Sequence, residues 1–299
     1  MKKRKSNTFL YIVIALCVLT IILIPMFFSF KTGNVALIPI KGTIVADGTP
    51  SMLGQELTSA EEVVAFIEEA NQDPNIQAIV LDINSPGGSA VASDEIAEAL
   101  KRTEKPTVAV IHEVGASGGY WIASATDQII SNRMSIVGSI GVISSYLEIS
   151  QLLENYNVTY QRLVAGKYKD VGTPFKELTE EERNILQIKL DKIHDFFIDA
   201  VAENRNMPRE NVAAIATGEI FLGTEALDLG LIDQLGNTKT AEEYLIQNFG
   251  LEEINYVSYE SRPSLLSALT QTTAPFFYYI GIGMGQSLFD TTDTLGIRV

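Results

Sequence analysis

The stretch that decides the fold is IQAIVLDINSPGGS, at residues 76–89. Its first eight residues form a nearly continuous apolar run, which is typical of a β-strand buried on both faces of a parallel sheet. Proline and glycine then end the strand in the segment NSPGG, residues 84–88. Such a segment is most often only a turn. At the carboxyl end of a parallel strand, however, ligands usually bind, and glycine leaves the backbone N–H groups open to them.

The segments on either side of this strand repeat one pattern. Residues 34–44 and 106–112 predict two more strands, because both are rich in β-branched residues. Residues 58–74 predict a helix with a Ser/Thr start and an early pair of glutamates, and residues 92–105 predict a second helix. Strands and helices therefore alternate, which predicts an α/β fold of stacked βαβ units with a mostly parallel sheet.

The second half of the chain is less regular. Residues 135–144 and 158–164 have strand-like composition, and residues 178–206 have the apolar spacing of a long amphipathic helix. Three further predictions follow along the chain: a helix after Pro208, a strand with a short helix and a turn over 218–236, and a helix over 240–250 that ends at glycine.

One serine lies among small residues in the segment EVGASGGYW, residues 113–121. Ser117 follows a strand and precedes a helix, so the ordinary interpretation is an N-cap. An N-cap does not require Gly118 and Gly119 after it, whereas a nucleophile benefits from them, because substrate must approach its hydroxyl closely. The amides of Gly118 and Gly88 could then form an oxyanion hole. We expect Tyr120 and Trp121 to anchor the helix against the core.

A serine nucleophile needs a base, and the chain has two histidines. His112 lies in a predicted buried strand and is expected to be a core residue. His194 lies in the long helix, where a surface position is expected. A Ser-His-Asp triad is therefore hard to assemble. A lysine can replace histidine where burial lowers its pKa, and the first lysines after Ser117 lie in AGKYKD, residues 165–170.

The combination of motifs resembles the signal peptide peptidase A family, in its short single-domain form. The resemblance rests on INSPGGS at 83–89, GASGGYWIASATDQI at 115–129, VGSIGVI at 137–143 and AGKYKDVGTP at 165–174, and it extends over roughly residues 35–247. No single motif is specific, but the set is. The resemblance implies a membrane-anchored serine protease of the ClpP/crotonase fold, with a Ser-Lys dyad and with no metal or other cofactor.

The resemblance also assigns roles to residues. The nucleophile falls on Ser117, and the base falls on Lys169 of the G-x-x-K-D pattern, with Lys167 as the alternative. A further serine that hydrogen-bonds the lysine falls on Ser139. A carboxylate beside the base would raise the pKa of its amine, so we expect Asp170 to point away from Lys169.

The family resemblance further implies a ring-like homo-oligomer, an octamer in the short form, in which the lysine of one subunit serves the serine of the next. The implied substrates are cleaved signal peptides and other short or unfolded peptides. Three alternatives remain: a related protease that cleaves one specific membrane-protein partner, a crotonase-like enzyme acting on acyl-CoA, and an inactive scaffold. The acyl-CoA alternative is disfavoured because the chain is strongly acidic, and the scaffold because both dyad residues are present.

The N-terminus predicts a membrane anchor. Residues 1–8 form a basic tail, and the apolar residues 9–30 would span about 33 Å as a helix, enough to cross a bilayer. The basic tail should stay in the cytoplasm, which places the catalytic domain outside it. A cleaved signal peptide is the alternative, but the apolar segment is longer than usual and no clean cleavage site follows it. Lipid modification of Cys17, the sole cysteine, is a further alternative, although the preceding Leu16 is bulky.

The remaining chain divides into a peptidase domain, residues 31–250, and a C-terminal extension of uncertain role, residues 251–299. The extension contains an apolar segment, residues 274–289, which is short for a membrane span. The formal net charge of the whole chain is −15, and the basic tail carries four of its positive charges. Such a surface repels phosphate backbones, so nucleic acid is not expected as a partner.

Overall fold

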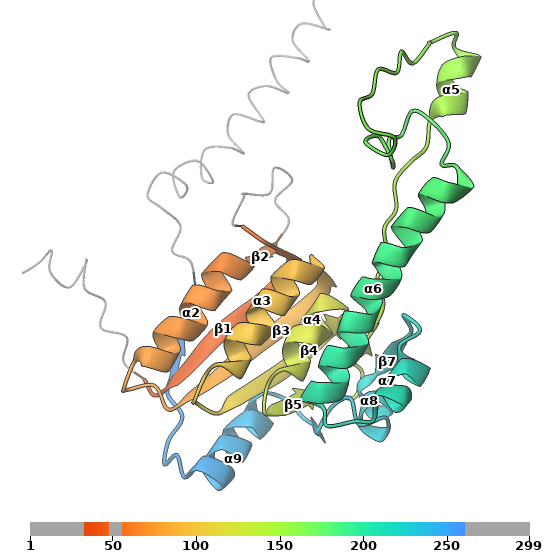
Figure 1. Cartoon of the computed structure of the whole chain (residues 1–299). Coiled ribbons are helices and arrows are strands. Elements are labelled where there is room, and N and C mark those ends of the chain that lie inside the picture. The colour runs from red at the N-terminus through yellow and green to blue at the C-terminus, as the bar shows by residue number, and fades with distance from the viewer. Residues whose placement is uncertain (1–32, 48–55, 261–299) are drawn as a thin grey trace, which may run out of the picture. The chain divides into compact units, whose positions relative to one another are not determined.

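The computed structural model describes residues 33–47 and 56–260 (Figure 1). The strands are β1 (Val35–Val45), β2 (Leu57–Ser59), β3 (Ala78–Gly88), β4 (Thr107–Ala116), β5 (Gln128–Ser131), β6 (Ile136–Gly138), β7 (Ile220–Leu222), β8 (Gln234–Leu235) and β9 (Tyr256–Ser258). The helices are α2 (Ala60–Gln72), α3 (Ala90–Lys101), α4 (Gly118–Ser124), α5 (Ser150–Asn155), α6 (Glu180–Asn204), α7 (Arg209–Ile215), α8 (Gly223–Asp228) and α9 (Thr238–Phe249).

The described strands form one sheet, with the central order β2-β1-β3-β4-β5-β8. The pairs along this order are parallel, and β9 also pairs with β1 in parallel. Strand β6 pairs in parallel with the last three residues of β4. On its other side, β6 pairs with β7, and this pair is antiparallel. The predicted α/β fold with a mostly parallel sheet is confirmed.

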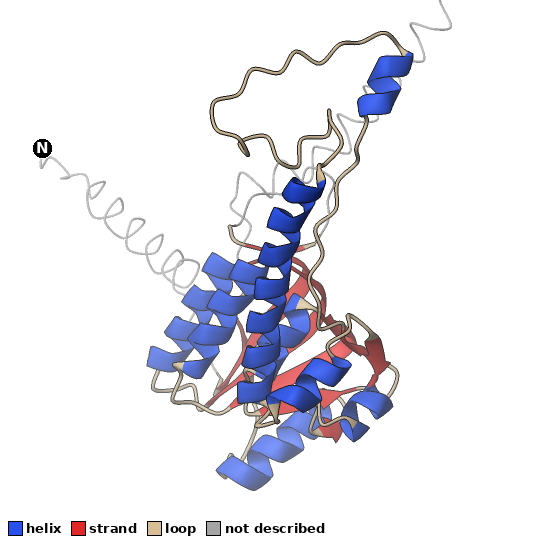
Figure 2. Cartoon of the chain, turned by 45° about the vertical axis from the view of Figure 1, so that its right-hand side comes forward, coloured by secondary structure: helices blue, strands red, loops and turns tan. Residues whose placement is uncertain are grey.

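The sheet is buried on two faces because alternate residues of a strand point to opposite sides. Ile79, Leu81 and Ile83 of β3 pack in a large core with α2, α3, α4 and α6, which lie over one face (Figures 1 and 2). Ala78 and Val80 pack on the other face, in a smaller core with α9. This two-sided burial explains the unbroken apolar run in the sequence.

Local capping explains where the principal helices begin. Ser59 caps α2 and Ser89 caps α3, each accepting a hydrogen bond from an amide in the first turn. Helix α6 starts with a capping box, in which Thr179 and Glu182 bond each other's backbone amides. The helices predicted over 58–74, 92–105 and 178–206 are therefore confirmed, with their ends shifted by a few residues.

One strand prediction is confirmed only in part, and one is wrong. The strand-like run 135–144 is a strand only over β6, and residues 158–164 form no strand. Both runs contain β-branched residues, but a strand requires a hydrogen-bonded partner. Residues 141–179 instead form an arm that carries α5 and extends beyond the start of α6 (Figure 1).

The expected anchor, residues 9–30, and the basic tail, residues 1–8, lie outside the described residues. Within the described residues, no helix is long and apolar enough to span a membrane. The sheet continues past the expected domain end at residue 250, because β9 pairs with β1, and the compact unit extends to Tyr259. The rest of the expected extension, from 261, also lies outside the described part.

Candidate active site

Ser117 occupies a sharp turn between β4 and α4. Its backbone has φ 51° and ψ −123°, a conformation that a residue with a side chain rarely adopts. Two backbone hydrogen bonds hold it there: its N–H donates to Gly138 O (2.8 Å), and its carbonyl accepts from Trp121 N (2.9 Å). A strained strand-to-helix turn of this kind presents a serine hydroxyl at the surface of an α/β sheet, as in hydrolase nucleophile elbows.

The structure also tests the interpretation of Ser117 as an ordinary cap. The residue does occupy the N-cap position of α4, but its side chain makes no capping hydrogen bond. Ser117 is half-buried and lines a cleft. Strain without a capping bond is what a functional serine requires and a structural one does not.

The glycines beside Ser117 are required by close backbone contacts. A Cβ at Gly87 would lie 2.7 Å from Gly118 N and 2.8 Å from the Ser117 Cβ. A Cβ at Gly118 would lie 3.3 Å from Gly88 N and 2.2 Å from the Ser93 Oγ. The backbones of the NSPGG turn and of the α4 start therefore adjoin next to Ser117. This arrangement brings Gly88 and Gly118 together and is compatible with a shared oxyanion hole.

Replacing Gly118 by alanine is expected to lower kcat by roughly a hundredfold and to destabilise the fold by about 1–3 kcal/mol, because the new Cβ would collide with Ser93. Kinetic assays and denaturant unfolding measure the two effects. The double variant Gly118→Ala/Ser93→Ala should recover much of the stability, because the colliding Oγ is removed. Full activity of Gly118→Ala would contradict the assignment of this amide.

A backbone hydrogen bond connects Ser117 to the residue just before Ser139. The φ of Ser139 is also positive, at 52°, and its N–H donates to Glu219 O (2.8 Å). Gly138, the residue before it, accepts the hydrogen bond from the Ser117 amide. Both serines line one cleft of about 700 Å³. The structure therefore brings together four of the five expected site residues: Ser117, Ser139, Gly88 and Gly118.

The helix that follows Ser117 is fixed to the core as expected. Tyr120 is fully buried, and its hydroxyl donates to Leu231 O (2.8 Å). Burial raises the pKa of this hydroxyl, so it stays protonated as a donor. Trp121 stacks on Phe197 of α6, with ring centroids 4.5 Å apart. These contacts join α4 to α6, and the two stacked residues, Trp121 and Phe197, line the cleft.

Lys169, the fifth expected residue, is not part of this cleft. It lies in the 141–179 arm, and its side chain is exposed. The arm extends beyond the first turn of α6, away from the sheet and the start of α4 (Figure 1). Within the described residues, the Lys169 amine has no carboxylate within ion-pair distance. The two members of the expected dyad are therefore separated within a single chain.

Lys167, the alternative base, is engaged elsewhere. Its Nζ donates to both carboxylate oxygens of Glu181 (2.8 and 2.7 Å). This hydrogen bond, with a second contact to Tyr168, raises the pKa of Lys167 above its usual range. An amine held in its charged form cannot accept a proton, so Lys167 is a poor candidate for the base.

Asp170, next to Lys169, is turned toward other cations. Arg162 donates two hydrogen bonds to its carboxylate (2.5 and 2.9 Å), and Lys176 lies 3.4 Å away. The hydrogen bond from Arg162 holds the pKa of Asp170 well below its usual range. Lys176 similarly lowers the pKa of Glu182 at the start of α6. This cluster joins the arm to α6.

We expect acid to loosen the arm. Because the folded-state pKa values of Asp170 and Glu182 are lowered, their stabilisation is complete above the unfolded values near pH 4 and is lost as the pH falls below them. Amide hydrogen exchange in residues 160–176, corrected for the intrinsic effect of pH, should stay constant from about pH 5 to 8 and accelerate below about pH 4. Amides of β3 serve as the control. Acceleration that begins above pH 5 would contradict this role of the cluster.

Both histidine predictions are wrong. His112 is not a core residue: its side chain is 42% exposed and pairs with Asp82. By strand alternation it lies on the same face as Val108 and Val110, which pack in the smaller core with α9, but it lies beyond that core. His194 is not on the open surface. It is half-buried and lines the Ser117 cleft, and its buried Nε2 has no hydrogen-bond partner in the part of the chain that the structure describes. Sequence reasoning missed this position, although helical spacing places His194 one turn before Phe197, on the same face of α6.

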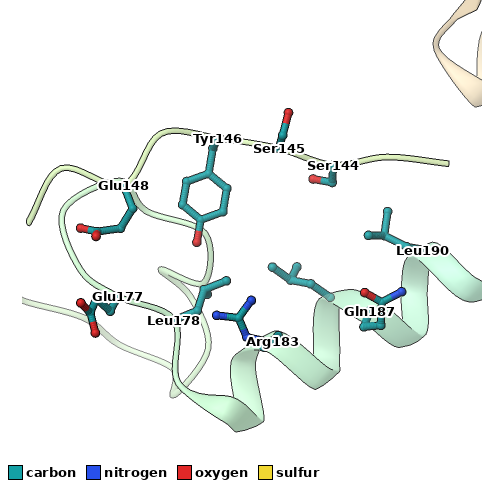
Figure 3. Close-up of a pocket in the computed structure, with 10 residues that line it drawn as sticks. Ser144, Ser145, Tyr146, Glu148, Glu177, Leu178, Arg183, Gln187 and Leu190 are labelled. Carbon is teal, nitrogen blue, oxygen red and sulfur yellow. The ribbon is translucent and has the colours of Figure 1, made fainter.

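A second pocket, of about 440 Å³, lies at the base of the arm (Figure 3). Tyr146 of the arm and Arg183 of α6 project into it from opposite walls. Gln187 and Leu190 line both this pocket and the Ser117 cleft, so the two form one groove along α6. From Gln187 to Phe197 the helix rises about 15 Å, the length of four or five residues of extended peptide.

The sequence model described as Peptidase family S49 matches residues 99–252, which include Ser117, Ser139 and Lys169. The chain belongs to peptidase family S49. The model of the NfeD1b N-terminal domain matches residues 34–149, which include the NSPGG turn. Membership of family S49 makes the protein a peptidase, and it confirms the expected relationship to the signal peptide peptidase A family.

Named relatives agree with this assignment. The "Putative protease slr0021" of Synechocystis is 35% identical over 232 residues, which are 76% of this chain and 79% of that protein. The "Putative signal peptide peptidase SppA" of Enterococcus faecium is 31% identical over 74% of this chain and 65% of its own. The "Putative protease MJ0651" of Methanocaldococcus jannaschii is 29% identical over 78% of this chain and 74% of its own. This S49 peptidase therefore matches them over most of its length.

Proposed function

We propose that this S49 peptidase is a membrane-anchored serine endopeptidase that uses Ser117 as nucleophile and Lys169 of a neighbouring subunit as base. The observation that carries the proposal is the strained backbone of Ser117, which lines the cleft and whose hydroxyl does not cap its helix. A substrate carbonyl placed there would lie beside Gly88 and Gly118, whose amides would stabilise the oxyanion.

The separation of Ser117 and Lys169 within one chain supports a site shared between subunits. The arm that carries Lys169 exposes several large apolar side chains, among them Ile143 (90% exposed), Leu147 (82%) and Leu163 (98%). Apolar side chains gathered on one segment favour a protein contact. Docking of the arm on a neighbouring copy would cover these residues and bring Lys169 toward that copy's Ser117, which leads to a ring when repeated.

The reaction follows from these positions. The Ser117 hydroxyl attacks the peptide carbonyl and transfers its proton to the neutral amine of Lys169, with Ser139 orienting that amine. The tetrahedral intermediate collapses as the lysine returns the proton to the leaving amine. A water molecule then gives a proton to the lysine and attacks the acyl-enzyme. As the second tetrahedral intermediate collapses, the lysine returns that proton to the Ser117 oxygen, which releases the second product and restores both residues. Because the amine must be neutral, activity should increase with pH.

The proposed substrates are cleaved signal peptides and other short or unfolded peptides. These peptides would be released at the same membrane in which the segment 9–30 would anchor the protein. The groove along α6 supports this choice, because an extended peptide fits its length and its walls include apolar residues such as Val142 and Leu190. The name of the Enterococcus faecium relative points to the same substrates.

Hydrolysis of a synthetic signal peptide should be at least about a hundredfold more efficient, as kcat/KM, than cleavage of a folded domain that contains the same sequence in a buried helix. Mass spectrometry of the products measures the rate of cleavage of both substrates and locates the cleaved bond. Equal rates for the two substrates would overturn the assignment to short or unfolded peptides. A charged peptide of equal length is the matched control for the contribution of the apolar residues in the walls of the groove.

A further inference from the structure

We propose that His194 is a substrate-binding residue, whose imidazole hydrogen-bonds the main chain of a peptide in the Ser117 cleft. The inference rests on the proposed function and adds a residue to it. Its basis is the one titratable side chain of the cleft that combines burial with an unmet hydrogen bond. Among the described residues, His194 Nε2 is buried and has no hydrogen-bond partner, whereas Asp191, the other titratable residue that lines the cleft, is exposed and accepts from Gln187 (2.7 Å).

An unpartnered buried nitrogen is a cost to the free protein. A buried polar group without a hydrogen bond typically destabilises a fold by about 1–3 kcal/mol, so such groups are rare unless a function maintains them. Packing alone would be served better by leucine or phenylalanine at this position. The imidazole therefore lacks a structural reason in the free chain, and a ligand that supplies a hydrogen bond would remove the cost.

The position of His194 identifies the ligand as peptide. Ser117 lies one helical turn before Trp121 on α4, and His194 lies one turn before Phe197 on α6, while Trp121 and Phe197 stack on each other. Both Ser117 and His194 line the same cleft. A peptide whose carbonyl approaches Ser117 therefore passes along the face of α6 that carries the imidazole.

The chemistry of the cleft favours the peptide main chain over its side chains. Several of the groups around His194 are apolar, including Leu190, Ile193 and Phe197, and would receive apolar substrate side chains. A main-chain amide is the polar group that every peptide brings, whatever its sequence. Because Nε2 is buried in the free protein, the proposal requires the His194 side chain to change its rotamer so that Nε2 turns toward this amide.

The test compares His194→Leu with His194→Gln, whose side-chain amide oxygen can accept a hydrogen bond from a main-chain N–H in place of Nε2. We expect His194→Leu to raise KM about tenfold with kcat changed by less than about threefold, and His194→Gln to restore KM. The unfolding temperature of His194→Leu should equal or exceed that of the wild type, because the unpartnered nitrogen is gone. An unchanged KM in His194→Leu, equal impairment in both variants, or a lower unfolding temperature in His194→Leu would overturn the proposal.

A binding experiment separates this inference from the proposed catalytic roles. In the Ser117→Ala background, the Kd of a peptide is measured with each amide replaced in turn by an ester. One ester should weaken binding several-fold with His194 present and have no effect in the Ser117→Ala/His194→Leu protein. If no ester position depends on His194, the inference fails even when Ser117 proves essential. If Ser117→Ala retains full hydrolysis, the proposed function fails instead, whatever the esters show.

Discussion

Replacing Ser117 by alanine is expected to lower peptide hydrolysis by at least about a thousandfold, because the attacking oxygen is removed. The free energy of unfolding should change by less than about 0.5 kcal/mol, since alanine keeps the Cβ and the hydroxyl makes no capping bond. Both quantities are measured on the same preparation, by fluorogenic peptide hydrolysis and by denaturant unfolding.

A serine-directed covalent probe gives an independent measurement of the same claim. It should label wild-type protein at Ser117 and leave Ser117→Ala unlabelled. Ser258→Ala is the matched control, because Ser258 is an exposed serine of β9 that lines neither pocket, and this variant should keep both the Ser117 labelling and the activity. Labelling at another serine, or activity that survives in Ser117→Ala, would be incompatible with the assigned nucleophile.

Replacing Lys169 by alanine is the second change with a large expected effect, again a loss of roughly a thousandfold in kcat. The Lys169→Ala protein should remain folded, because Lys169 is exposed and makes no ion pair among the described residues. Lys167→Ala is the matched control, two residues away on the same arm. It breaks the ion pair with Glu181 but should leave most of the activity.

The pH profile distinguishes the role of Lys169 from a merely structural one. Wild-type activity should increase with pH, because general-base catalysis requires an unprotonated base, whereas the small remaining activity of Lys169→Ala should lack this rise. A loss of activity in Lys167→Ala with normal activity in Lys169→Ala would reverse the assignment. A flat wild-type profile from about pH 6 to 10 would argue against any lysine base.

The βαβ core could be predicted from the sequence because its strands and helices are marked by local sequence patterns. The apolar run ending at Ile83 and the Ser caps of α2 and α3 need no long-range information. Ser117 was found for a related reason: small residues between a strand and a helix are a local signal. Its strained φ of 51° follows from contacts with residues far along the chain and was not visible in the sequence.

The arm and the two histidines were not predictable from local patterns. Residues 158–164 have the composition of a strand, but no strand among the described residues pairs with them. His112 lies in an apolar run, yet the smaller core on its face of β4 ends at Val110, and its imidazole is exposed and pairs with Asp82. His194 depends on which face of α6 meets α4, and the Trp121–Phe197 stack decides this.

The most direct test of the shared site is complementation between two inactive proteins. Ser117→Ala and Lys169→Ala, each nearly inactive alone, are produced together so that mixed assemblies form. If the lysine of one subunit serves the serine of the next, mixed assemblies should regain activity, up to about a quarter of the wild-type rate for random mixing. If mixed assemblies form and remain as inactive as either parent, the serine and the lysine do not act across subunits, and the central claim is wrong.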